Sequence, residues 1–543
     1  MTSSSDLDVL IVGAGFAGLF ELHHLRAMGC TVKVFEAGGD IGGVWYHNRY
    51  DGARVDSVVP VYEFSDEHLW KDFDWSQRYP DWKEIRRYFR YVDEKLDLRK
   101  DIVFNRKVVS ARWNADKDRW YVTSQDGSVV NPRFLLLCVG NNSKIYIPDI
   151  AGMDRFRGEC HHTARWPQEG LELDGKRVAV IGTGASGVQI VQDLGPRASQ
   201  LTVFQRTPNI AFPMRQQSID AETSRRMKEK VYRMVYRRRR QTYGGHVYDL
   251  YPKNSTDATP EERYLFFEDL WNRCGGLELV AANYKDIRRN QEVNDELYAF
   301  WRAKVLPRIH RTDVQNILAP LHSPHPIGAK RASLEVSYYE TFNLPHVELV
   351  DLVQNPILNF TENGILAADG RERPFDVIIL ATGFDAMTGG IIQIDIEGTD
   401  GISISDKWAK GVRTNLGMMT SNFPNMFFMY AVQSPAALAN GPSVIEAQGE
   451  WINACIKSML DDKLTRIESL KDAEEEWRQV VFESMSGSLF DAPTSVFMGR
   501  NIPGKKFEPL LYFGGIPEYT RLCQEKMKDG YAGFLRSSVG VPS

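Results

Sequence analysis

Two glycine-rich loops, each placed between an apolar run and a helix-like stretch, constrain this chain more than any other feature. Gly13-Ala-Gly15-Phe-Ala-Gly18 follows the apolar run 8–12, and Gly182-Thr-Gly184-Ala-Ser-Gly187 follows the run 177–181. In such loops the first glycine permits a tight turn, the second lets a pyrophosphate approach the backbone, and the third lets helix and strand pack closely. Strand, loop and helix together predict a dinucleotide-binding fold, and the chain has two.

The residue that follows the next strand indicates which nucleotide each fold binds. Glu36 follows the strand 31–35 in the first fold. A carboxylate there accepts ribose hydroxyl hydrogen bonds and repels a 2′-phosphate, which favours FAD or NAD. In the second fold Arg206 and Thr207 follow the strand 200–204. Arginine accommodates a 2′-phosphate, which favours NADP, although a surface arginine without a ligand is the alternative. Two such sites in one chain predict hydride transfer from NADPH to a flavin.

The fold class is therefore α/β, with two Rossmann-like dinucleotide-binding domains (FAD and NADP) and a helical insertion. We expect an FAD domain over 1–145 and 386–543, an NADP domain over 146–213 and 328–385, and the insertion over 214–327. Thr259, Pro260 and Glu262 are typical of a capped helix start within the insertion. Strands near 103–109, 119–124 and 134–138 predict a β-meander in the first fold.

Charge and cysteine content exclude several classes. The net charge of −5 gives no bulk attraction to nucleic acid or to an anionic membrane. The four arginines 237–240 are interpreted as a solvated helix face rather than a nucleic-acid site. None of the six cysteines forms a CxxC pair, which excludes a dithiol reductase and a zinc site. The N-terminus has no secretory pattern and its apolar run is too short to cross a bilayer, so we expect a cytoplasmic protein.

A segment between the two loops resembles a known family. Residues 156–167, Phe-Arg-Gly-Glu-Cys-His-His-Thr-Ala-Arg-Trp-Pro, fit FxGxxxHxxxW[P/D], the fingerprint of type I Baeyer–Villiger monooxygenases. Gly42-Gly43-Val-Trp45, Tyr50, Gly52 and Asp56 fit a second family pattern, in which Asp51 replaces the usual proline. Segments 326–331, 381–389, 423–425 and 501–505 are also similar, so the resemblance covers nearly the whole chain.

The resemblance implies an NADPH- and O2-dependent conversion of ketones to esters or lactones through a flavin peroxide. It assigns Arg331 to stabilise the peroxide and the intermediate, since a fixed cation with several donors suits both charges. Asp56 would orient Arg331. A phosphate contact is the alternative for Arg331, and a turn cap is the alternative for Asp56. Lys330 is expected to contact the 2′-phosphate together with Arg206 and Thr207.

The remaining expected cofactor residues surround the two glycine loops. They are Gly13, Gly15, Phe16, Gly18, Glu36, Gly43, Val44, Trp45, Arg54, Asp56, Tyr62, Val108, Thr183, Gly184, Ala185, Ser186, Gly187 and Gln189. Trp45 and Tyr62 either line the flavin or pack in a core. His162 either supports conformational change between the domains, as in the family, or is a buried histidine bonded to backbone. Val496 stands where the family has a tryptophan that contacts the nicotinamide cofactor.

Two other functions remain as alternatives. One is a flavin monooxygenase that oxidises sulfides or amines, and the other is a flavin-binding protein without turnover. The Trp166-Pro167 ending and Arg331 favour the ketone reaction over the first. The NADPH site argues against the second. The expected partners are a small ketone and O2, with no metal, nucleic acid or membrane, and a monomer is compatible with the sequence. Loops 430–440 and 485–500 are expected to shape the substrate pocket.

Overall fold

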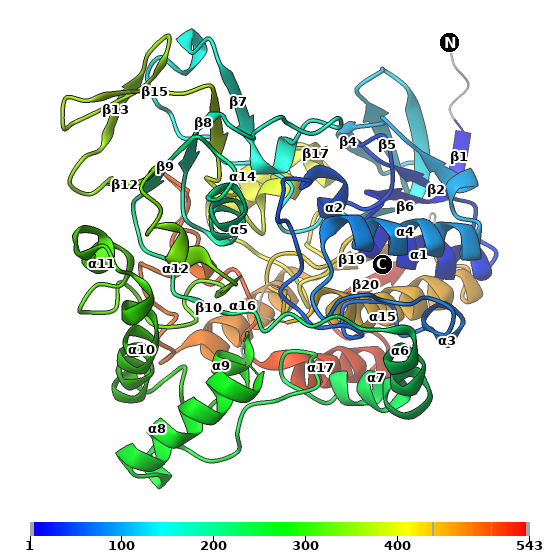
Figure 1. The fold of residues 1–543 in the computed structure, drawn as a ribbon. Coiled ribbons are helices and arrows are strands. Elements are labelled where there is room, and N and C mark those ends of the chain that lie inside the picture. The colour runs from blue at the N-terminus through cyan, green and yellow to red at the C-terminus, as the bar shows by residue number, and fades with distance from the viewer. Residues whose placement is uncertain (1–4, 275, 437–438, 501, 539–543) are drawn as a thin grey trace.

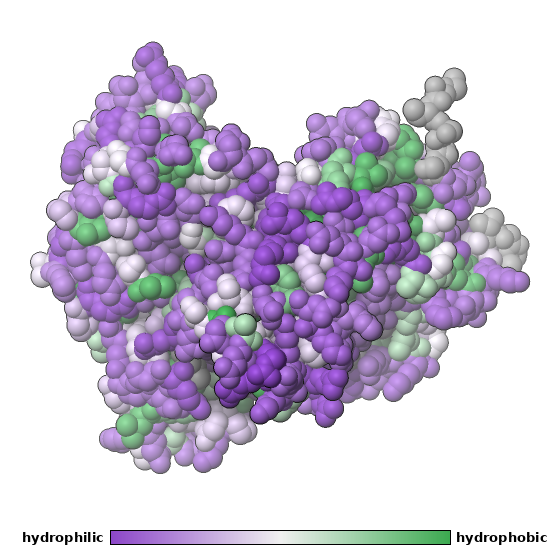
Figure 2. All heavy atoms as spheres, turned by 45° about the vertical axis from the view of Figure 1, so that its right-hand side comes forward, coloured by the Kyte–Doolittle hydropathy of each residue, from purple (hydrophilic) through white to green (hydrophobic). Residues whose placement is uncertain are grey.

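The computed structural model describes residues 5–274, 276–436, 439–500 and 502–538. Figure 1 shows two α/β units side by side, with helices from the middle and the end of the chain packed beneath them. Figure 2 shows a largely hydrophilic face with a notch at its upper edge, between two lobes. No helix in the described part of the chain has both the length and the apolar character needed to cross a bilayer.

The first unit is built on an eight-stranded sheet in the order β17-β4-β5-β6-β1-β2-β3, with β18 also paired to β6. Its core is parallel, because β1 pairs in parallel with β2 and β6, whereas β4, β5 and β6 pair antiparallel. The strands are β1 Ser5–Val12, β2 Val32–Phe35, β3 Ile102–Val103, β4 Val108–Asn114, β5 Arg119–Ser124, β6 Val129–Leu137, β17 Asp395–Glu397 and β18 Met426–Phe428.

The meander expected in this unit exists as β4-β5-β6, but its first strand was placed wrongly. The stretch 103–109 is divided between β3 and β4, which lie at opposite sides of the sheet. Asn105 adopts a left-handed conformation (φ 53°) between them, which turns the chain. The short strand β3 instead extends the parallel sheet beside β2.

The second unit is a five-stranded, fully parallel sheet in the order β12-β9-β8-β16-β7. Its strands are β7 Glu159–His162, β8 Arg177–Ile181, β9 Gln200–Gln205, β12 Val347–Asp351 and β16 Val377–Leu380. The central strands β8, β9 and β16 are buried almost throughout, as a sheet covered on both faces requires. A small antiparallel sheet adjoins it, made of β13 Ile357–Phe360, β14 Gly364–Ala367 and β15 Glu372–Pro374.

The insertion leaves and rejoins the second unit through the paired strands β10 Ala211–Pro213 and β11 Ser333–Glu335. Its helices are α6 Ala221–Met227, α7 Arg233–Arg239, α8 Pro260–Asp269, α9 Glu278–Ala281, α10 Gln291–Val305 and α11 Thr312–Leu318, with π-helical segments at Lys228–Tyr232 and Leu270–Cys274. The predicted start of α8 is confirmed: Thr259 and Glu262 form a reciprocal capping box with Pro260 in the first turn.

The interpretation of the arginine run as a solvated helix face was wrong for Arg239. Its side chain has no exposed surface, and its Nη1 donates to the carbonyl oxygens of Val61 at 3.0 Å and Glu63 at 2.8 Å. Its Nη2 lies 2.6 Å from a carboxylate oxygen of Glu446. Helix α7 therefore packs against the first unit, and the buried charge is paired there, as burial of a charge requires.

The first unit also gathers helices from both ends of the chain. Helix α1 Phe16–Ala27 packs against α15 Gly441–Asp461, and Figure 1 shows α15 running beneath it. Near the N-terminus lie α2 Val44–His47, α3 Glu67–Trp70 and α4 Trp82–Leu96. The other elements are α5 Ala185–Leu194, α12 Tyr338–Thr341, α13 Gly389–Ile392, α14 Ile404–Ala409, α16 Lys471–Met485, α17 Gly515–Lys528, β19 Arg466–Ser469 and β20 Phe534–Ser537.

Candidate active site

The first glycine loop opens helix α1 in the geometry that a pyrophosphate needs. Gly13 has φ +105°, and a Cβ there would stand 2.6 Å from the carbonyl oxygen of Cys138. A Cβ on Gly18 would lie 1.9 Å from the carbonyl oxygen of Gly13, whereas Gly15 and Gly43 face each other across the loop. Bare backbone is thus presented at the N-terminus of α1, where an anionic pyrophosphate is favoured.

Glu36 follows β2 and lies against the same loop. Its Oε2 accepts a hydrogen bond from the backbone N–H of Ala14 at 2.6 Å, and its Oε1 accepts one from Gly38 at 2.6 Å. Burial raises the pKa of this carboxyl, while the backbone donors oppose that rise. A carboxylate has lone pairs beyond those two bonds, so ribose hydroxyls can still donate to it. The loop and Glu36 together fit FAD.

An aromatic cluster stands beside the loop. The indole Nε1–H of Trp45 donates to the hydroxyl oxygen of Tyr62 at 3.0 Å, with the two rings edge to face. Phe16 packs edge-on against Tyr62 at 5.3 Å, and its side chain belongs to the core of the first unit. Val44 precedes Trp45 on α2 and is exposed. The side chain of Phe16 therefore packs in the core. Trp45 and Tyr62 stand beside the loop and carry polar groups, an indole N–H and a hydroxyl, at the edges of their rings.

Two predicted cofactor residues lie in other surroundings. Val108 begins β4, and its side chain is buried in a core cluster, so any ligand contact there falls to its backbone. Arg54 donates to the side-chain oxygen of Gln77 at 3.3 Å and to the carbonyl oxygen of Tyr79 at 3.1 Å. Its own carbonyl accepts a hydrogen bond from Gln189 at 3.1 Å. Arg54 thus lies where the first unit meets α5 of the second.

The second glycine loop repeats the geometry of the first. Gly182 has φ +104°, and a Cβ there would stand 2.5 Å from the carbonyl oxygen of Ala381. A Cβ on Gly187 would lie 2.2 Å from the carbonyl oxygen of Gly182, whereas one on Gly184 would have no described atom within 4 Å. Gly184 caps α5, which begins at Ala185. Space is therefore left at this N-terminus for a second pyrophosphate.

A cationic site adjoins this loop. Thr183 donates its hydroxyl hydrogen to the carbonyl oxygen of Thr207 at 3.0 Å, which fixes the segment that follows Arg206. Burial lowers the pKa of Lys330, and the positive charge of Arg206 lowers it further. Two cations close enough to repel each other are stabilised by an anion between them. Arg206, Thr207 and Lys330 therefore fit the 2′-phosphate of NADP.

Other residues of the second loop tie the two units together. The hydroxyl of Tyr50 lies 2.8 Å from Oε1 of Gln189 and 3.1 Å from the hydroxyl oxygen of Ser186. Gln189 is buried, and its amide is already engaged with Tyr50 and Arg54. The structure thus places the side chains of Gln189 and Ser186 at the interface between the two units.

Asp51, which replaces the family proline, adds a contact across this interface. Its carboxylate lies 3.1 Å from Nη1 of Arg197, just beyond the end of α5. The same arginine contacts Asp174 and Asp193, each at 2.6 Å. The turn that carries Asp51 is therefore linked to the second unit by an ion pair in addition to the Tyr50 contacts.

Arg331 and Asp56 are joined directly, although they are 275 residues apart. Nη2 of Arg331 donates to Oδ1 of Asp56 at 2.8 Å, and Nε donates to Oδ2, so the pair is bidentate. The side chains keep 36% and 23% of their accessible surface, so both border space that solvent or a ligand can reach. The bidentate contact fixes the plane of the guanidinium.

Electrostatics keep both members of this pair charged. Burial raises the pKa of Asp56, but the charge and hydrogen bonds of Arg331 outweigh it and leave the pKa below its usual value. Burial lowers the pKa of Arg331, and the charge and hydrogen bonds of Asp56 more than reverse this. The site therefore presents a permanent cation that does not transfer its proton.

Sequence reasoning missed two residues of this site. Tyr430 and His246 both interact electrostatically with the guanidinium of Arg331. Tyr430 lies in the loop 430–440 and has a left-handed backbone (φ 51°), a conformation that no sequence pattern predicts. His246 follows Gly244 and Gly245, a glycine pair inside a helix-rich region that marks a loop. Residues 437–438 of the expected substrate loop lie outside the described residues.

His162 is held by backbone on both sides of its ring. Its Nδ1 accepts a hydrogen bond from the N–H of Ala164, and its Nε2 lies 3.1 Å from the carbonyl oxygen of Gly383. Burial lowers the pKa of His162 to about 4, so the ring is neutral and Nε2 is the donor. The imidazole ties β7 to the turn after β16. A role in conformational change stays a prediction.

Val496 lies beside the segment that carries Lys330 and Arg331. Its backbone N–H donates to the carbonyl oxygen of Ala329 at 3.3 Å. The segment that follows also contacts the second unit. Nζ of Lys505 donates to a carboxylate oxygen of Asp385 and to the carbonyl oxygen of Ala386, each at 2.8 Å. Asn501, the first residue of that family segment, lies outside the described residues.

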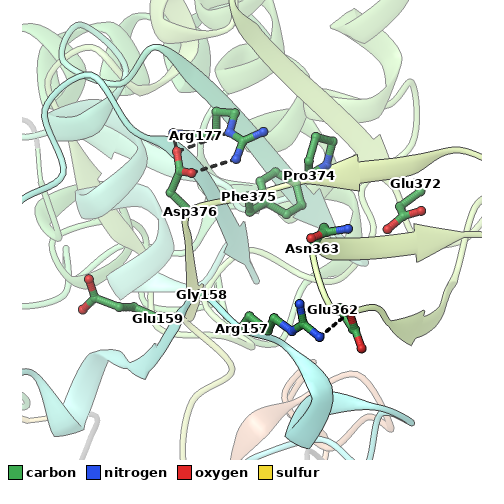
Figure 3. A pocket seen from close by; sticks show the side chains of 10 residues that line it. All are labelled: Arg157, Gly158, Glu159, Arg177, Glu362, Asn363, Glu372, Pro374, Phe375 and Asp376. Carbon is green, nitrogen blue, oxygen red and sulfur yellow. Dashed lines mark hydrogen bonds and ion pairs between the residues drawn. The ribbon is translucent and has the colours of Figure 1, made fainter.

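A separate hollow of about 760 Å³ is lined by residues at the starts of β7 and β8 and by residues of the small antiparallel sheet (Figure 3). Its walls carry the ion pairs Arg157–Glu362 and Arg177–Asp376, each already satisfied. It contains none of the predicted site residues, so its size alone does not make it the candidate site.

Comparison with known proteins gives consistent matches. Residues 7–217 match the family described as FMO-like, flavin-binding monooxygenase-like. The chain is 44% identical to cyclopentanone 1,2-monooxygenase of a Comamonas species over 98% of this chain and 96% of that protein. It is 34% identical to a Baeyer–Villiger monooxygenase of Pseudooceanicola batsensis over 98% and 97% of the two chains. A crystal structure titled as OTEMO in complex with FAD and NADP superposes with a TM-score of 0.93 at 34% identity, covering 98% and 100%.

Proposed function

This chain belongs to the Baeyer–Villiger monooxygenases within the flavin-binding monooxygenase-like family, and we propose that it converts a ketone to an ester or lactone. In that reaction, ketone, O2, NADPH and a proton give ester or lactone, NADP+ and water. FAD and NADPH are its cofactors. When bound, FAD would supply the redox chemistry: it would take two electrons from NADPH and deliver one oxygen atom of O2 to the ketone, and the other oxygen atom would be released as water.

The bidentate pair of Arg331 and Asp56 is the observation that carries this proposal. The carbonyl oxygen of the substrate gains negative charge when the carbonyl carbon is attacked, and a fixed donor array stabilises that charge. Arg331 keeps its proton at any working pH, so it can hydrogen-bond an anion without protonating it. Asp56 holds the guanidinium plane through Nε and Nη2. Arg331 is the proposed catalytic residue and Asp56 its positioning residue.

The proposed cofactor contacts follow from the two loops. Glu36 and the backbone of Gly13, Gly15 and Gly43 would hold the ribose and pyrophosphate of FAD, with Trp45 and Tyr62 beside its ring. The backbone around Gly184 would hold the pyrophosphate of NADPH. Arg206, Thr207 and Lys330 would hold its 2′-phosphate, which distinguishes NADPH from NADH.

We also propose the domain division stated from the sequence. Support for an FAD domain over 1–145 and 386–543 comes from β17 and β18, which join the first sheet. Support for an NADP domain over 146–213 and 328–385 comes from β12 and β16 in the second sheet. The insertion 214–327 bridges them, because α7 contacts the first unit through Arg239. The free thiols of Cys30, Cys138, Cys160, Cys455 and Cys523 support a cytoplasmic location.

The test is direct. Purified protein is incubated with NADPH, O2 and a panel of cyclic and linear ketones, and the products are identified by mass spectrometry. We expect a mass increase of one oxygen atom and an ester or lactone product. Replacement of Arg331 by alanine should leave flavin reduction by NADPH intact and abolish ester formation. Ready sulfoxidation with no ester from any ketone would instead support the alternative monooxygenase.

A further inference from the structure

The segment that carries Lys330 and Arg331 begins with a tight turn, 326–329. The backbone N–H of the last residue of this turn donates to the carbonyl oxygen of the first at 3.0 Å, which closes it. Gly328 occupies the third position with φ +94°, a left-handed conformation that glycine adopts without strain. Because Lys330 and Arg331 follow directly, the orientation of the turn sets the direction in which both side chains leave the backbone.

Asn294, on helix α10 of the insertion, holds this turn through both polar groups of one residue. The backbone N–H of Ile327 donates to Oδ1 of Asn294 at 2.8 Å, and Nδ2 of Asn294 donates to the carbonyl oxygen of Ile327 at 3.2 Å. Nδ2 also donates to the carbonyl oxygen of Ile287 at 3.1 Å. The asparagine is 1% exposed, so these bonds are shielded from water. A single buried amide therefore links the insertion to the turn.

The other contacts of the turn are apolar. A Cβ on Gly328 would stand 2.6 Å from a ring carbon of Phe490 and 3.1 Å from a methyl carbon of Val280. The side chain of Ile327 is 1% exposed. Apolar packing is not directional, so it confines the turn without fixing how its peptide planes are rotated. The hydrogen bonds of Asn294 are directional and do fix that rotation.

We propose that Asn294 is a positioning residue for Lys330 and Arg331 together. This rests on the proposed function, in which Lys330 contacts the 2′-phosphate of NADPH and Arg331 stabilises the reacting carbonyl oxygen. Arg331 must meet Asp56 of the first unit in a bidentate contact, and small displacements of a catalytic group are costly in rate. Both cations leave the same turn, so loss of the Asn294 bonds should impair cofactor selection and oxygen insertion at the same time.

Two substitutions at this position test the hydrogen bonds. Asn294→Ala removes both bonds to Ile327, so the affinity for NADP+ and the rate of ester formation at saturating NADPH should each fall by roughly 5- to 30-fold. The affinity for NAD+, which has no 2′-phosphate, should stay within about threefold of the wild type. Asn294→Asp, assayed at about pH 6, should stay within about threefold in every measurement, because burial keeps the new carboxyl protonated, with one acceptor and one donor for Ile327.

Asn283 offers a matched control in the same insertion. It is fully buried, its Nδ2 donates to the carbonyl oxygen of Leu279 at 2.9 Å, and its Oδ1 accepts a hydrogen bond from the N–H of Tyr284 at 2.8 Å. Asn283→Ala should lower the melting temperature as Asn294→Ala does and leave NADP+ affinity and ester formation unchanged. NADP+ and NAD+ are titrated into the FAD-loaded enzyme by isothermal titration calorimetry, which needs no turnover. FAD content and thermal melting establish that each variant is folded.

Each result bears on a separate claim. Equal behaviour of Asn294→Ala and Asn283→Ala overturns the inference, because it assigns the amide to stability alone. Loss of NADP+ affinity or of ester formation without the other overturns the claim that one turn positions both cations, and an equal loss of NADP+ and NAD+ affinity overturns the route through Lys330. If Asn294→Ala does not retain FAD, Asn294→Ser carries the same prediction, since its hydroxyl is too short to reach both groups of Ile327. Absence of ester from every ketone with the wild type overturns the proposed function, whereas the NADP+ affinities still decide the role of Asn294 toward Lys330.

Discussion

Replacing Asp56 by asparagine tests whether the orientation of Arg331 matters to the reaction. The change keeps the shape of the side chain but places an amide NH2 group opposite one of the two guanidinium donors. One of the two bonds is lost, and the other changes from a charged to a neutral acceptor. A hydrogen bond to a charged group contributes about 1.5–3 kcal/mol, and solvent at these partly exposed side chains favours the lower half of that range.

The expected loss of orienting free energy is about 2–3 kcal/mol in total. At about 1.4 kcal/mol per tenfold change in rate, ester formation should slow by roughly 30- to 150-fold. Asp56 is proposed to act through Arg331 on the oxygen-insertion step, so the rate of FAD reduction by NADPH should stay within about threefold of the wild type. Consumption of NADPH without ester formation should therefore rise.

The assay is stopped-flow reduction of the flavin under anaerobic conditions, followed by turnover with product quantified against NADPH consumed. FAD content and far-ultraviolet circular dichroism establish that the variant is folded. Ester formation within threefold of the wild type, at unchanged coupling, would refute the argument that Asp56 positions Arg331. An equal loss in both half-reactions would indicate a structural defect instead.

Three further predictions address the cofactor site, the core and the family substitution. Lys330→Ala should raise the KM for NADPH by about 10- to 100-fold and leave the KM for NADH unchanged, because only NADPH carries the 2′-phosphate; a parallel rise for both cofactors contradicts the assignment, and Arg206→Ala provides the comparison. Glu21 is fully buried, both carboxyl oxygens are unpartnered among the described residues, and burial raises its pKa well above normal. The wild type should therefore lose stability as pH rises above about 4.3, by up to about 1.4 kcal/mol per pH unit until the folded-state pKa is reached. Glu21→Met should consequently melt above the wild type by a margin that grows from pH 5 to pH 8, with Glu21→Gln as the non-ionisable control; a margin independent of pH contradicts this. Val496→Trp should lower the KM for NADPH and reduce uncoupled NADPH oxidation, and no change in either refutes a role for the missing indole.

Local pattern was enough to predict the parts of the fold that depend on neighbouring residues. In each loop the first and third glycines are required because a Cβ there would collide with a carbonyl oxygen, whereas the middle glycine leaves space for a pyrophosphate, and the spacing of the pattern encodes these requirements. The capping box at Thr259 and Glu262 spans four residues and was equally readable. Glu36 and Arg206 could be placed because each lies at the end of a strand adjacent to its loop.

Contacts between distant segments were not readable in this way. The meander strand near 103–109 was misplaced because β3 forms only by pairing with β2. The burial of Arg239 depends on Val61, Glu63 and Glu446, none of which is near it in the chain. A run of four arginines carries no signal of such partners, so the sequence indicated solvent where the structure has a buried ion pair.

The sequence by itself determined that two dinucleotide folds are present, which cofactors they favour and, through the segment 156–167, which family the chain resembles. Only the tertiary structure joined Arg331 to Asp56 across 275 residues. The reason is physical: strand, turn and helix preferences act over a few residues, whereas the geometry of a charged pair depends on how whole units pack. The two glycine loops indicate where the cofactors lie, whereas the packing of the units decides which side chains lie between the two cofactor sites.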